Sequence, residues 1–298
     1  MISMIDLRQS SHYKQYMESI GWKVEIADNC QVFIKKIPLG LGSFIKILRP
    51  SPPIPFKEID KVAKRHRAWF VKLEPNITDH DPRSTIHDLK INGFRPSSWP
   101  LAPSKTLQIN LAQPRETLFK QCEKRARNAI RKAVREGVVV VQSKDIEQFC
   151  SAWVKSMRRK GSLLATGGQI KDIWQAFSKN AHLLLANQLT NKTRLLAGAL
   201  VITYDRIAHY MFATSTKEGN RFGAPSVVVW KAMLLAKKLG CRIFDLEGIY
   251  DPRYHQATKS WRGFSRFKKG FGGEEITYIG SFIKTYTLLG KLVTLLSR

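Results

Sequence analysis

Acidic residues and cysteines are scarce in this sequence. Its 298 residues include 23 Asp and Glu against 50 Lys and Arg, which gives a formal net charge of +27. A positive excess of this size points to a polyanionic partner: nucleic acid, an anionic membrane surface or a phosphorylated substrate. The four cysteines are scattered, without a CxxC pair or neighbouring histidines. This argues against a disulfide framework or a zinc site and predicts reduced thiols in the cytosol.

The sequence also lacks the segments and motifs that define several other classes of protein. No run approaches the roughly 20 apolar residues of a membrane-spanning helix, and residues 1–11 lack the apolar core of a signal peptide. GxSxG, GxxxxGK[ST] and GxGxxG motifs are absent, and the seven histidines show no metal-ligand spacing, so we expect no metal site. We expect a cytoplasmic protein that is soluble or lies on a membrane surface.

The most informative stretch lies in the last third of the chain. Two apolar runs, Leu196–Tyr204 and Arg206–Thr214, flank a Tyr-Asp-Arg turn and predict a β-hairpin. Ser226–Leu239 has helical spacing and stops at Gly240, and residues 242–246 have the composition of a short buried strand. This order of strand, strand, helix and strand is typical of the core of a GNAT-type acyltransferase.

The first half of the chain has a similar order of elements. The two halves share no recognisable sequence repeat, so a duplication is inferred from the order of the elements alone. The proline-rich connector RPSSWPLAPSK marks a boundary. We therefore predict an α/β protein of two tandem GNAT-like domains with mixed central sheets. Residues 1–103 together with 281–298 form the first domain, and residues 104–280 form the second.

The cofactor loop of that fold is degraded. A GNAT acetyltransferase binds the CoA pyrophosphate with a [QR]xxGx[GA] loop at a helix start. The matching residues 220–225 read NRFGAP and keep only the central Gly223. Pro225 removes one of the N–H donors that the loop would use. The sequence thus predicts the fold without its usual cofactor.

The segment Arg115–Gly137 is predicted to be the most basic helix. One of its faces is apolar, and the others carry cations with few acids to balance them. Because nearly all of the charges on this surface are positive, the pattern favours phosphate binding over a charged surface that only contacts water. The candidate phosphate-binding residues are Lys124, Arg127, Arg131 and Arg135.

The combined pattern resembles the FemABX family of peptidoglycan bridge aminoacyltransferases, which are built from two GNAT-like domains. The most specific motifs are FDLEGI at 244–249 and FKKGFGG at 267–273, supported by RNAIRKAVREG at 127–137 and KLEP at 72–75. No long polar insertion interrupts residues 144–161, so the coiled-coil arm of the larger relatives is not expected.

The resemblance implies a reaction. Family members transfer an aminoacyl group from aminoacyl-tRNA to the stem-peptide amine of UDP-MurNAc-pentapeptide or lipid II, and so form a cell-wall cross-bridge. Aminoacyl-tRNA is then the donor substrate, no separate cofactor is expected, and the four basic candidates become tRNA-binding residues. We expect a monomer that can touch an anionic membrane.

The resemblance also implies roles for the FKKGFGG residues. Lys268 matches the lysine of the family's Phe-Lys pair, and a cation placed there would stabilise the tetrahedral oxyanion. Lys269 takes that role if the local register differs. Phe267 is expected to stack on the terminal adenosine of tRNA or to pack in the core. Gly272 and Gly273 are expected to allow positive φ or a close backbone approach.

Acidic and aromatic residues complete the candidate site. Glu74 precedes a proline and is expected to bind or deprotonate the acceptor amine, although a carboxylate at a strand end often only accepts hydrogen bonds. Asp245 and Glu247 end a strand and are expected to face the same cleft, with a structural role as the alternative for Asp245. Tyr210 and Phe212 match a Tyr-Met-Tyr acceptor-binding motif with one hydroxyl lost, which leaves the acceptor's identity open.

Three points stay open at this stage. Ser281–Arg298 gathers apolar residues on one helical face, which either packs on the first domain or rests on an anionic membrane. An N-acyltransferase that uses acyl-CoA or another thioester is one alternative function. A nonenzymatic RNA-binding protein is the other.

Overall fold

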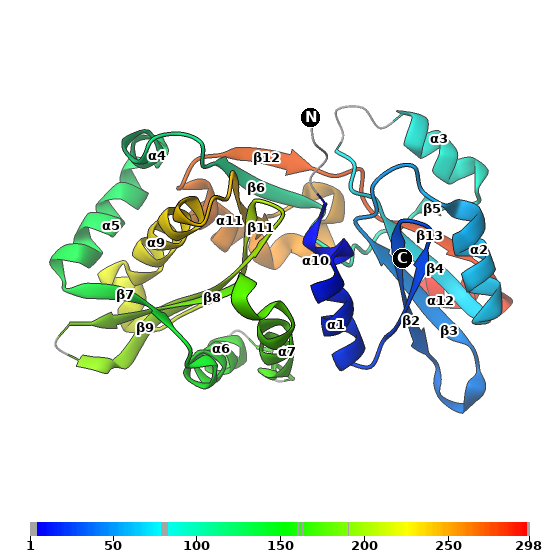
Figure 1. Ribbon diagram of the computed structural model, residues 1–298, viewed down its shortest axis with the longest axis horizontal. Helices are drawn as coiled ribbons and strands as arrows, with labels where there is room; N and C mark the ends of the chain where they lie inside the picture. The colour runs from blue at the N-terminus through cyan, green and yellow to red at the C-terminus, as the bar shows by residue number, and fades with distance from the viewer. Residues whose placement is uncertain (1–4, 79–82, 160, 163, 190, 297–298) are drawn as a thin grey trace. The chain divides into compact units, whose positions relative to one another are not determined.

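The computed structural model describes residues 5–78, 83–159, 161–162, 164–189 and 191–296 and divides into two compact units (Figure 1). Unit 1 contains residues 1–106, 248–262 and 276–298, and unit 2 contains residues 107–247 and 263–275. Each unit has a mixed sheet covered by helices, which confirms the predicted α/β class with two mixed sheets. Residues 248–262 belong to unit 1 in this division, whereas the sequence predicts that they lie in a second domain of residues 104–280. The predicted domain limits stay a prediction.

The sheet of unit 1 has six strands in the order β1-β2-β3-β4-β13-β5. They are β1 (Lys23–Ala27), β2 (Cys30–Lys36), β3 (Ser43–Leu48), β4 (Ala68–Glu74), β5 (Arg95–Pro96) and β13 (Phe282–Thr285). β3 and β4 are parallel, whereas β1–β2, β2–β3 and both pairs of β13 are antiparallel. A strand from the last part of the sequence therefore lies between two strands from the first part.

Helices cover both faces of this sheet. Those of unit 1 are α1 (Ser11–Ser19), α2 (Phe56–Arg65), α3 (Arg83–Ile91), α10 (His255–Thr258) and α12 (Leu288–Leu296). On α2, Ile59, Val62 and Ala63 follow helical spacing and are buried in one core with residues of β3 and β4. On the other face, the ring centroids of Tyr13 in α1 and Phe33 in β2 are 5.8 Å apart. The alternation of buried residues along the strands requires both covers.

The second sheet has seven strands in the order β12-β6-β11-β10-β9-β8-β7. They are β6 (Lys105–Asn110), β7 (Val138–Ser143), β8 (Ala181–Gln188), β9 (Asn191–Tyr204), β10 (Ile207–Ser215), β11 (Ile243–Gly248) and β12 (Glu274–Thr277). The predicted hairpin is β9 and β10, which pair antiparallel. β11 then pairs parallel with β10, so both strands end at the same edge of the sheet.

The helices of unit 2 are α4 (Arg115–Gln121), α5 (Lys124–Arg135), α6 (Ile146–Arg159), α7 (Gly168–Phe177), α8 (Lys217–Phe222), α9 (Ala224–Lys238) and α11 (Arg262–Lys269), the last of which begins at the unit boundary. α5 and α9 cover one face of the sheet, and α6 and α7 cover the other (Figure 1). The predicted helix Ser226–Leu239 is α9, which ends before Gly240 as expected.

Two expectations about local structure are wrong. The basic segment Arg115–Gly137 is two helices, because Cys122 and Glu123 have extended backbones and the Glu123 N–H donates to Gly270 O at 2.8 Å. The segment from Ser281 starts as strand β13, because its apolar residues pair with β4 before α12 begins. Between β11 and β12 the chain forms α10 and α11, and the FKK residues of the FKKGFGG motif end α11.

None of the helices in the described part of the chain is long and apolar enough to cross a bilayer.

The core of unit 1 predicts how single substitutions affect stability. Leu73 in β4 is fully buried, so Leu73→Ala should lower the free energy of unfolding by about 2–5 kcal/mol through lost contacts and a cavity. Ile91→Ala is the matched control, because Ile91 is exposed, and it should change stability by no more than about 0.5 kcal/mol. Urea unfolding measures both. Equal losses would contradict the assignment of Leu73 to the core.

Candidate functional site

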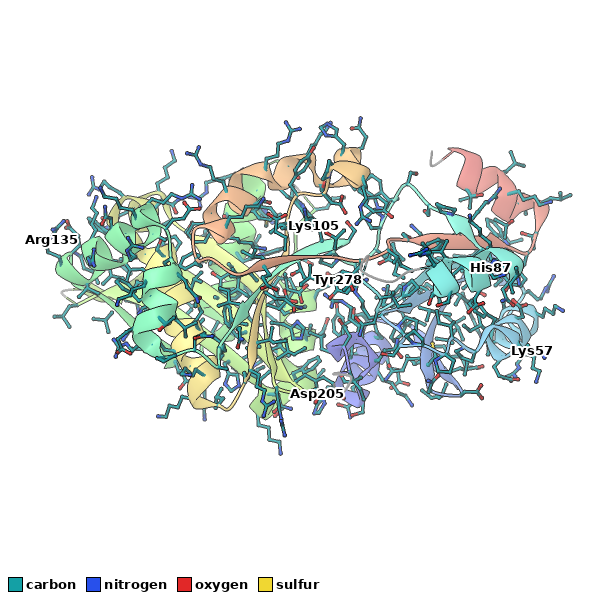
Figure 2. All side chains as sticks on the ribbon, turned by 90° about the horizontal axis from the view of Figure 1, so that it is seen from above. Lys57, His87, Lys105, Arg135, Asp205 and Tyr278 are labelled. Carbon is teal, nitrogen blue, oxygen red and sulfur yellow. The ribbon has the colours of Figure 1, made fainter. Side chains whose placement is uncertain are left out.

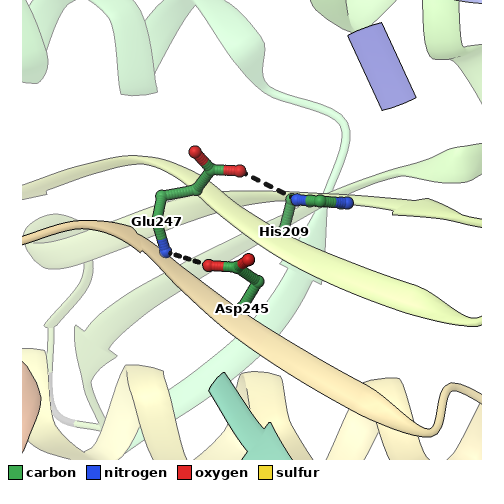
Figure 3. A group of neighbouring side chains, drawn as sticks. All are labelled: His209, Asp245 and Glu247. Carbon is green, nitrogen blue, oxygen red and sulfur yellow. Dashed lines mark hydrogen bonds and ion pairs between the residues drawn. The ribbon is translucent and has the colours of Figure 1, made fainter. Parts of the chain in front are cut away.

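A buried polar cluster lies where β10 and β11 run side by side (Figure 3). His209 and Asp245 are direct neighbours in the parallel register of these strands. Glu247 follows two residues after Asp245, near the end of β11. All three side chains are buried, although charged groups are costly to bury without partners.

Hydrogen bonds within the cluster offset that cost. The Nδ1 atom of His209 lies 2.8 Å from Oε1 of Glu247. Gln108 in β6 donates from Nε2 to Oδ2 of Asp245 at 3.0 Å. The other oxygen of Asp245 accepts the backbone N–H of Glu247 at 2.6 Å. Three neighbouring strands thus fix two carboxylates in one place.

The backbone of Glu247 is in the left-handed region, with φ of 57°. A residue with a side chain pays roughly 1–3 kcal/mol for such a conformation, which persists only where its surroundings enforce it. The bond from the Glu247 N–H to Asp245 and the bond from its side chain to His209 supply that support. Strain of this kind is concentrated at functional sites, which makes Glu247 the first residue to test.

Lys268 brings a positive charge to the two carboxylates. It lies near the end of α11, with its ammonium 4.8 Å from the ring centroid of Phe264. Burial lowers the pKa of Lys268 to about 8, while the charges of Glu247 and Asp245 act to raise it. The site is therefore a lysine cation that interacts with two fixed carboxylates.

The same cluster has the spacing of a metal site. One ring nitrogen of His209 and one oxygen from each of Asp245 and Glu247 lie within 4.8 Å of one another. However, both carboxylates already accept hydrogen bonds inside the cluster, and a metal ion would have to share them with the Lys268 cation. The arrangement favours a hydrogen-bonded acid–base network.

The other predicted residues of the FKKGFGG motif surround Lys268. Lys269 forms an ion pair with Glu275, and the Phe267 ring lies edge-on to Phe271 at 5.3 Å between centroids. Gly272 and Gly273 both have positive φ, as expected. A Cβ on Gly273 would lie 2.5 Å from the Gln108 carbonyl, so this glycine permits the close approach of the motif to β6.

The predicted aromatic pair lies elsewhere. Tyr210 follows His209 in β10 and is buried, with its ring 6.2 Å from that of Phe244. Burial raises the pKa of the Tyr210 hydroxyl well above its ordinary value. Phe212, beyond a bulge in the strand, packs edge-on against Trp153. These contacts place both rings in packed surroundings, and their predicted contact with the acceptor stays a prediction.

Glu74 ends β4 in unit 1 and is buried. Its two carboxylate oxygens accept the backbone N–H groups of Leu101 and Ala102, at 2.5 and 2.8 Å. These hydrogen bonds give Glu74 a structural role, because they attach the proline-rich connector to the end of β4. A role for Glu74 in binding or deprotonating the acceptor amine stays a prediction.

The four predicted phosphate-binding residues all lie on α5, but they differ in their surroundings. Lys124, Arg131 and Arg135 are exposed, and Arg135 points outward from the end of the helix (Figure 2). Arg127 instead donates to the carbonyls of Lys120 and Cys122 and so joins α4 to α5. Three of the four are therefore available to a polyanion.

The basic surface of α5 continues to the lysine site. Arg125 at the start of α5 donates from Nη2 to the Arg266 carbonyl on α11, two residues before Lys268. A Cβ on Gly270 would lie 3.5 Å from Nε of Arg125. The exposed cations along α5 are thus joined to α11 through Arg125, and we call this set the basic ridge: Lys124, Arg125, Arg131, Arg135 and Arg266.

His209 and Gln108 are not among the site residues predicted from the sequence. A signal existed for His209, because it is a polar residue inside the otherwise apolar run from Ile207 to Ala213. A histidine on a strand that is expected to be buried needs a partner, and Glu247 supplies it. Gln108 gave no comparable signal, since its partner comes from a strand 137 residues away in the sequence.

The degraded cofactor loop has a packing role in this structure. Gly223 separates α8 from α9 and has a left-handed backbone, with φ of 77°. A Cβ there would lie 2.5 Å from the Ala129 carbonyl on α5. The one glycine retained from the CoA motif is thus required by the contact between α9 and α5.

The electrostatics of the cluster predict how Lys268 titrates. In protein with ¹³C-methylated lysines, NMR should show Lys268 titrating near pH 8, and its assignment follows from loss of the signal in Lys268→Arg. Glu247→Gln should lower that pKa further, because the carboxylate favours the ammonium form.

Lys46 provides the control for this titration. Burial also lowers its pKa to about 8, but its nearby carboxylate is Glu74, so Glu247→Gln should leave it unchanged. A Lys268 signal that titrates near the ordinary lysine value, about 10.4, would contradict the site described above.

Comparison with solved structures identifies the fold. The crystal structure of FemX matches with a TM-score of 0.81 and 17% identity, over 98% of this chain and 95% of that one. The C-terminal domain of a putative lysylphosphatidylglycerol synthetase from Agrobacterium fabrum matches with a TM-score of 0.63 and 10% identity, over 98% and 92%. A tandem GNAT protein from the clavulanic acid biosynthesis pathway matches with a TM-score of 0.53 and 10% identity, over 86% and 78%.

Matches by sequence cover less of the chain than the matches by fold, but one of them names a family. No curated protein matches the chain. The model of the FemAB family matches residues 188–297, a segment that contains β10, β11, α11 and every member of the cluster except Gln108. By sequence this segment is similar to the FemAB family, and by fold nearly the whole chain is similar to FemX, which confirms the resemblance carried by its motifs.

Proposed function

We propose that this protein transfers an aminoacyl group from aminoacyl-tRNA to the stem-peptide amine of a peptidoglycan precursor, either UDP-MurNAc-pentapeptide or lipid II. The observation that carries the proposal is Lys268, a lysine of lowered pKa that interacts with Asp245 and Glu247. It lies in the segment that matches the FemAB family. The fold similarity to FemX supports the same reaction class.

The proposed reaction is an aminolysis. The amine nitrogen attacks the ester carbonyl of aminoacyl-tRNA, a C–N bond forms, and the carbonyl oxygen becomes an oxyanion. The C–O bond to the ribose then breaks, and the leaving oxygen takes the proton lost by the amine. The products are an amide and a tRNA with a free terminal hydroxyl. The chemistry needs a cation for the oxyanion and a group that holds the amine.

Lys268 is proposed as that cation. A positioned charge in a site of low dielectric stabilises a developing oxyanion without the cost of reorganising water. Its pKa of about 8 leaves most of the side chain protonated at neutral pH. The proposed role therefore uses the ammonium form, as a hydrogen-bond donor.

The two carboxylates are proposed to hold the amine. A substrate ammonium would be attracted by the negative charge of Asp245 and Glu247, which already acts on the Lys268 ammonium. Glu247, with its left-handed backbone at the end of β11, is the first of the two to test for contact with the amine. His209 acts through Glu247, as a positioning residue that fixes the direction of its carboxylate.

The basic ridge is proposed to bind the tRNA. Its exposed cations on α5 suit a phosphate backbone, and its contact with α11 leads toward Lys268. A positive surface that ends at the catalytic cation would bring the esterified end of a tRNA to the site. Phe267 remains the proposed stacking partner of the terminal adenosine.

A second donor class has less support. An acyl-CoA donor would use the loop at Gly223, but that glycine is required by packing against α5, and Pro225 follows it. A second acceptor class is a lipid, since one similar structure carries the name of a putative lysylphosphatidylglycerol synthetase. The assay below therefore includes both.

Single-turnover transfer from a mixed pool of labelled aminoacyl-tRNAs tests the proposal. Acceptors are UDP-MurNAc-pentapeptide, lipid II and phosphatidylglycerol, with acyl-CoA donors assayed in parallel. Label should move to one of the two peptidoglycan precursors. Transfer to phosphatidylglycerol alone, or from acyl-CoA alone, would replace the proposed substrates, and tRNA binding without any transfer would favour the RNA-binding alternative.

Lys268→Ala should slow this transfer by about 100- to 1,000-fold, the usual cost of losing an oxyanion-stabilising group. Lys269→Ala is the matched control, because its ammonium is engaged with Glu275, and it should change the rate only a few-fold. If the Lys269 variant were the inactive one, the oxyanion role would pass to that residue.

The basic ridge predicts the salt dependence of tRNA binding. Arg131→Ala and Arg135→Ala should each weaken tRNA binding and reduce the slope of log K against log salt by about 1 if each contacts one phosphate. Lys57→Ala is the control, because Lys57 is an exposed cation on α2 in unit 1 (Figure 2). Equal effects of all three substitutions would show that only the net charge matters.

A further inference from the structure

One end of the unit 1 sheet, where β2 ends and β3 and β4 begin, carries exposed apolar residues from two segments that are far apart in the sequence. The loop between β2 and β3 includes Leu39 and Leu41, with Leu39 93% exposed at the tip of the turn. The outer face of α12 displays Leu288, Leu289, Leu292 and Val293, all exposed. Their spacing on the helix forms a single apolar stripe. We call these six residues the apolar edge.

Trp69 at the start of β4 joins the two segments. Its Nε1 donates to the Leu41 carbonyl at 2.7 Å, and its own carbonyl accepts the N–H of Tyr286 at 2.9 Å, just before α12. A Cβ on Gly290 would lie 2.1 Å from the Trp69 carbonyl, so α12 is pressed against β4 through this glycine. The helix is therefore attached to the sheet by one side, while its leucines lie on the exposed side.

Cations accompany the apolar edge. Lys36 ends β2, Arg67 precedes β4, and Lys291 lies beside the stripe of α12, and all three are exposed. The Arg67 carbonyl accepts the Ser43 N–H at the start of β3, which places Arg67 beside the β2–β3 loop. The nearby acid Asp60 is already paired with Lys284. The edge is thus apolar with positive charge around it.

We propose that the apolar edge docks on an anionic lipid bilayer. Leucines that enter the boundary between headgroups and acyl chains, with lysine and arginine beside anionic headgroups, are the two features that peripheral membrane contact requires. The net charge of +27 favours the same partner. The proposal extends the proposed function, because it would bring the enzyme to the surface that holds a lipid-linked acceptor.

Co-sedimentation with vesicles tests this surface. The protein is mixed with vesicles of phosphatidylcholine alone, or of phosphatidylcholine and phosphatidylglycerol in equal amounts. Wild type should bind the mixed vesicles, and Leu39→Ser with Leu292→Ser should weaken that binding by about 10-fold or more. The matched control is Leu164→Ser with Leu189→Ser, which removes two leucines of unit 2 that are 94% and 62% exposed, and it should bind like wild type.

The proposal would be overturned if wild type did not bind the vesicles, or if both double variants bound them as well as wild type. It would also be overturned if both double variants lost vesicle binding to the same extent. A dimer in solution that only Leu39→Ser with Leu292→Ser abolishes would overturn it as well. The last would assign the edge to a second copy of the chain. Unfolding curves check that the variants remain folded. Transfer to the water-soluble UDP-linked acceptor without vesicles should be unchanged in both variants. Vesicle binding and aminoacyl transfer are thus measured separately, so failure of the membrane proposal does not contradict the proposed reaction, and failure of the proposed reaction does not contradict the membrane proposal.

Discussion

The candidate site depends on the hydrogen bond between the Asp245 carboxylate and the backbone N–H of Glu247. It holds a residue that is not glycine in the left-handed region and thereby keeps the Glu247 side chain within reach of His209. Gln108 in turn orients Asp245. Three strands that are remote in sequence therefore maintain one strained residue, and the cost of that strain is supplied by the stability of the whole sheet.

The site also reverses the sign of the surrounding charge. The chain carries +27 overall, yet two buried carboxylates lie together beside Lys268. A tRNA phosphate is attracted by the basic ridge but not by the carboxylates, whereas a substrate ammonium is attracted by the carboxylates alone. In the proposed reaction, this division would allow the protein to hold a polyanionic donor and a cationic amine in neighbouring places, with Lys268 where the two would meet.

Much of this architecture could be predicted from local patterns. The β9–β10 hairpin and α9 follow directly from apolar runs, a turn and a glycine stop, and the FDLEGI and FKKGFGG motifs lie in the segment that matches the FemAB family model. The break between α4 and α5, the strand β13 and the bond from Gln108 to Asp245 could not be predicted, because each is stabilised by a partner more than 100 residues away. The bonds of Glu74 could not be predicted either, since its carboxylate accepts from a connector 27 and 28 residues further along the chain.

The most direct test of the central claim is the pH dependence of single-turnover transfer, corrected for spontaneous hydrolysis of the aminoacyl ester. If Lys268 acts as an ammonium ion, the contribution it makes to the rate is full below its pKa of about 8 and is lost as the pH rises through that value. The ratio of wild-type to Lys268→Ala rates should therefore fall above pH 8. A ratio that rises through the same pH would contradict the account, because it would mean that the neutral lysine acts as a base.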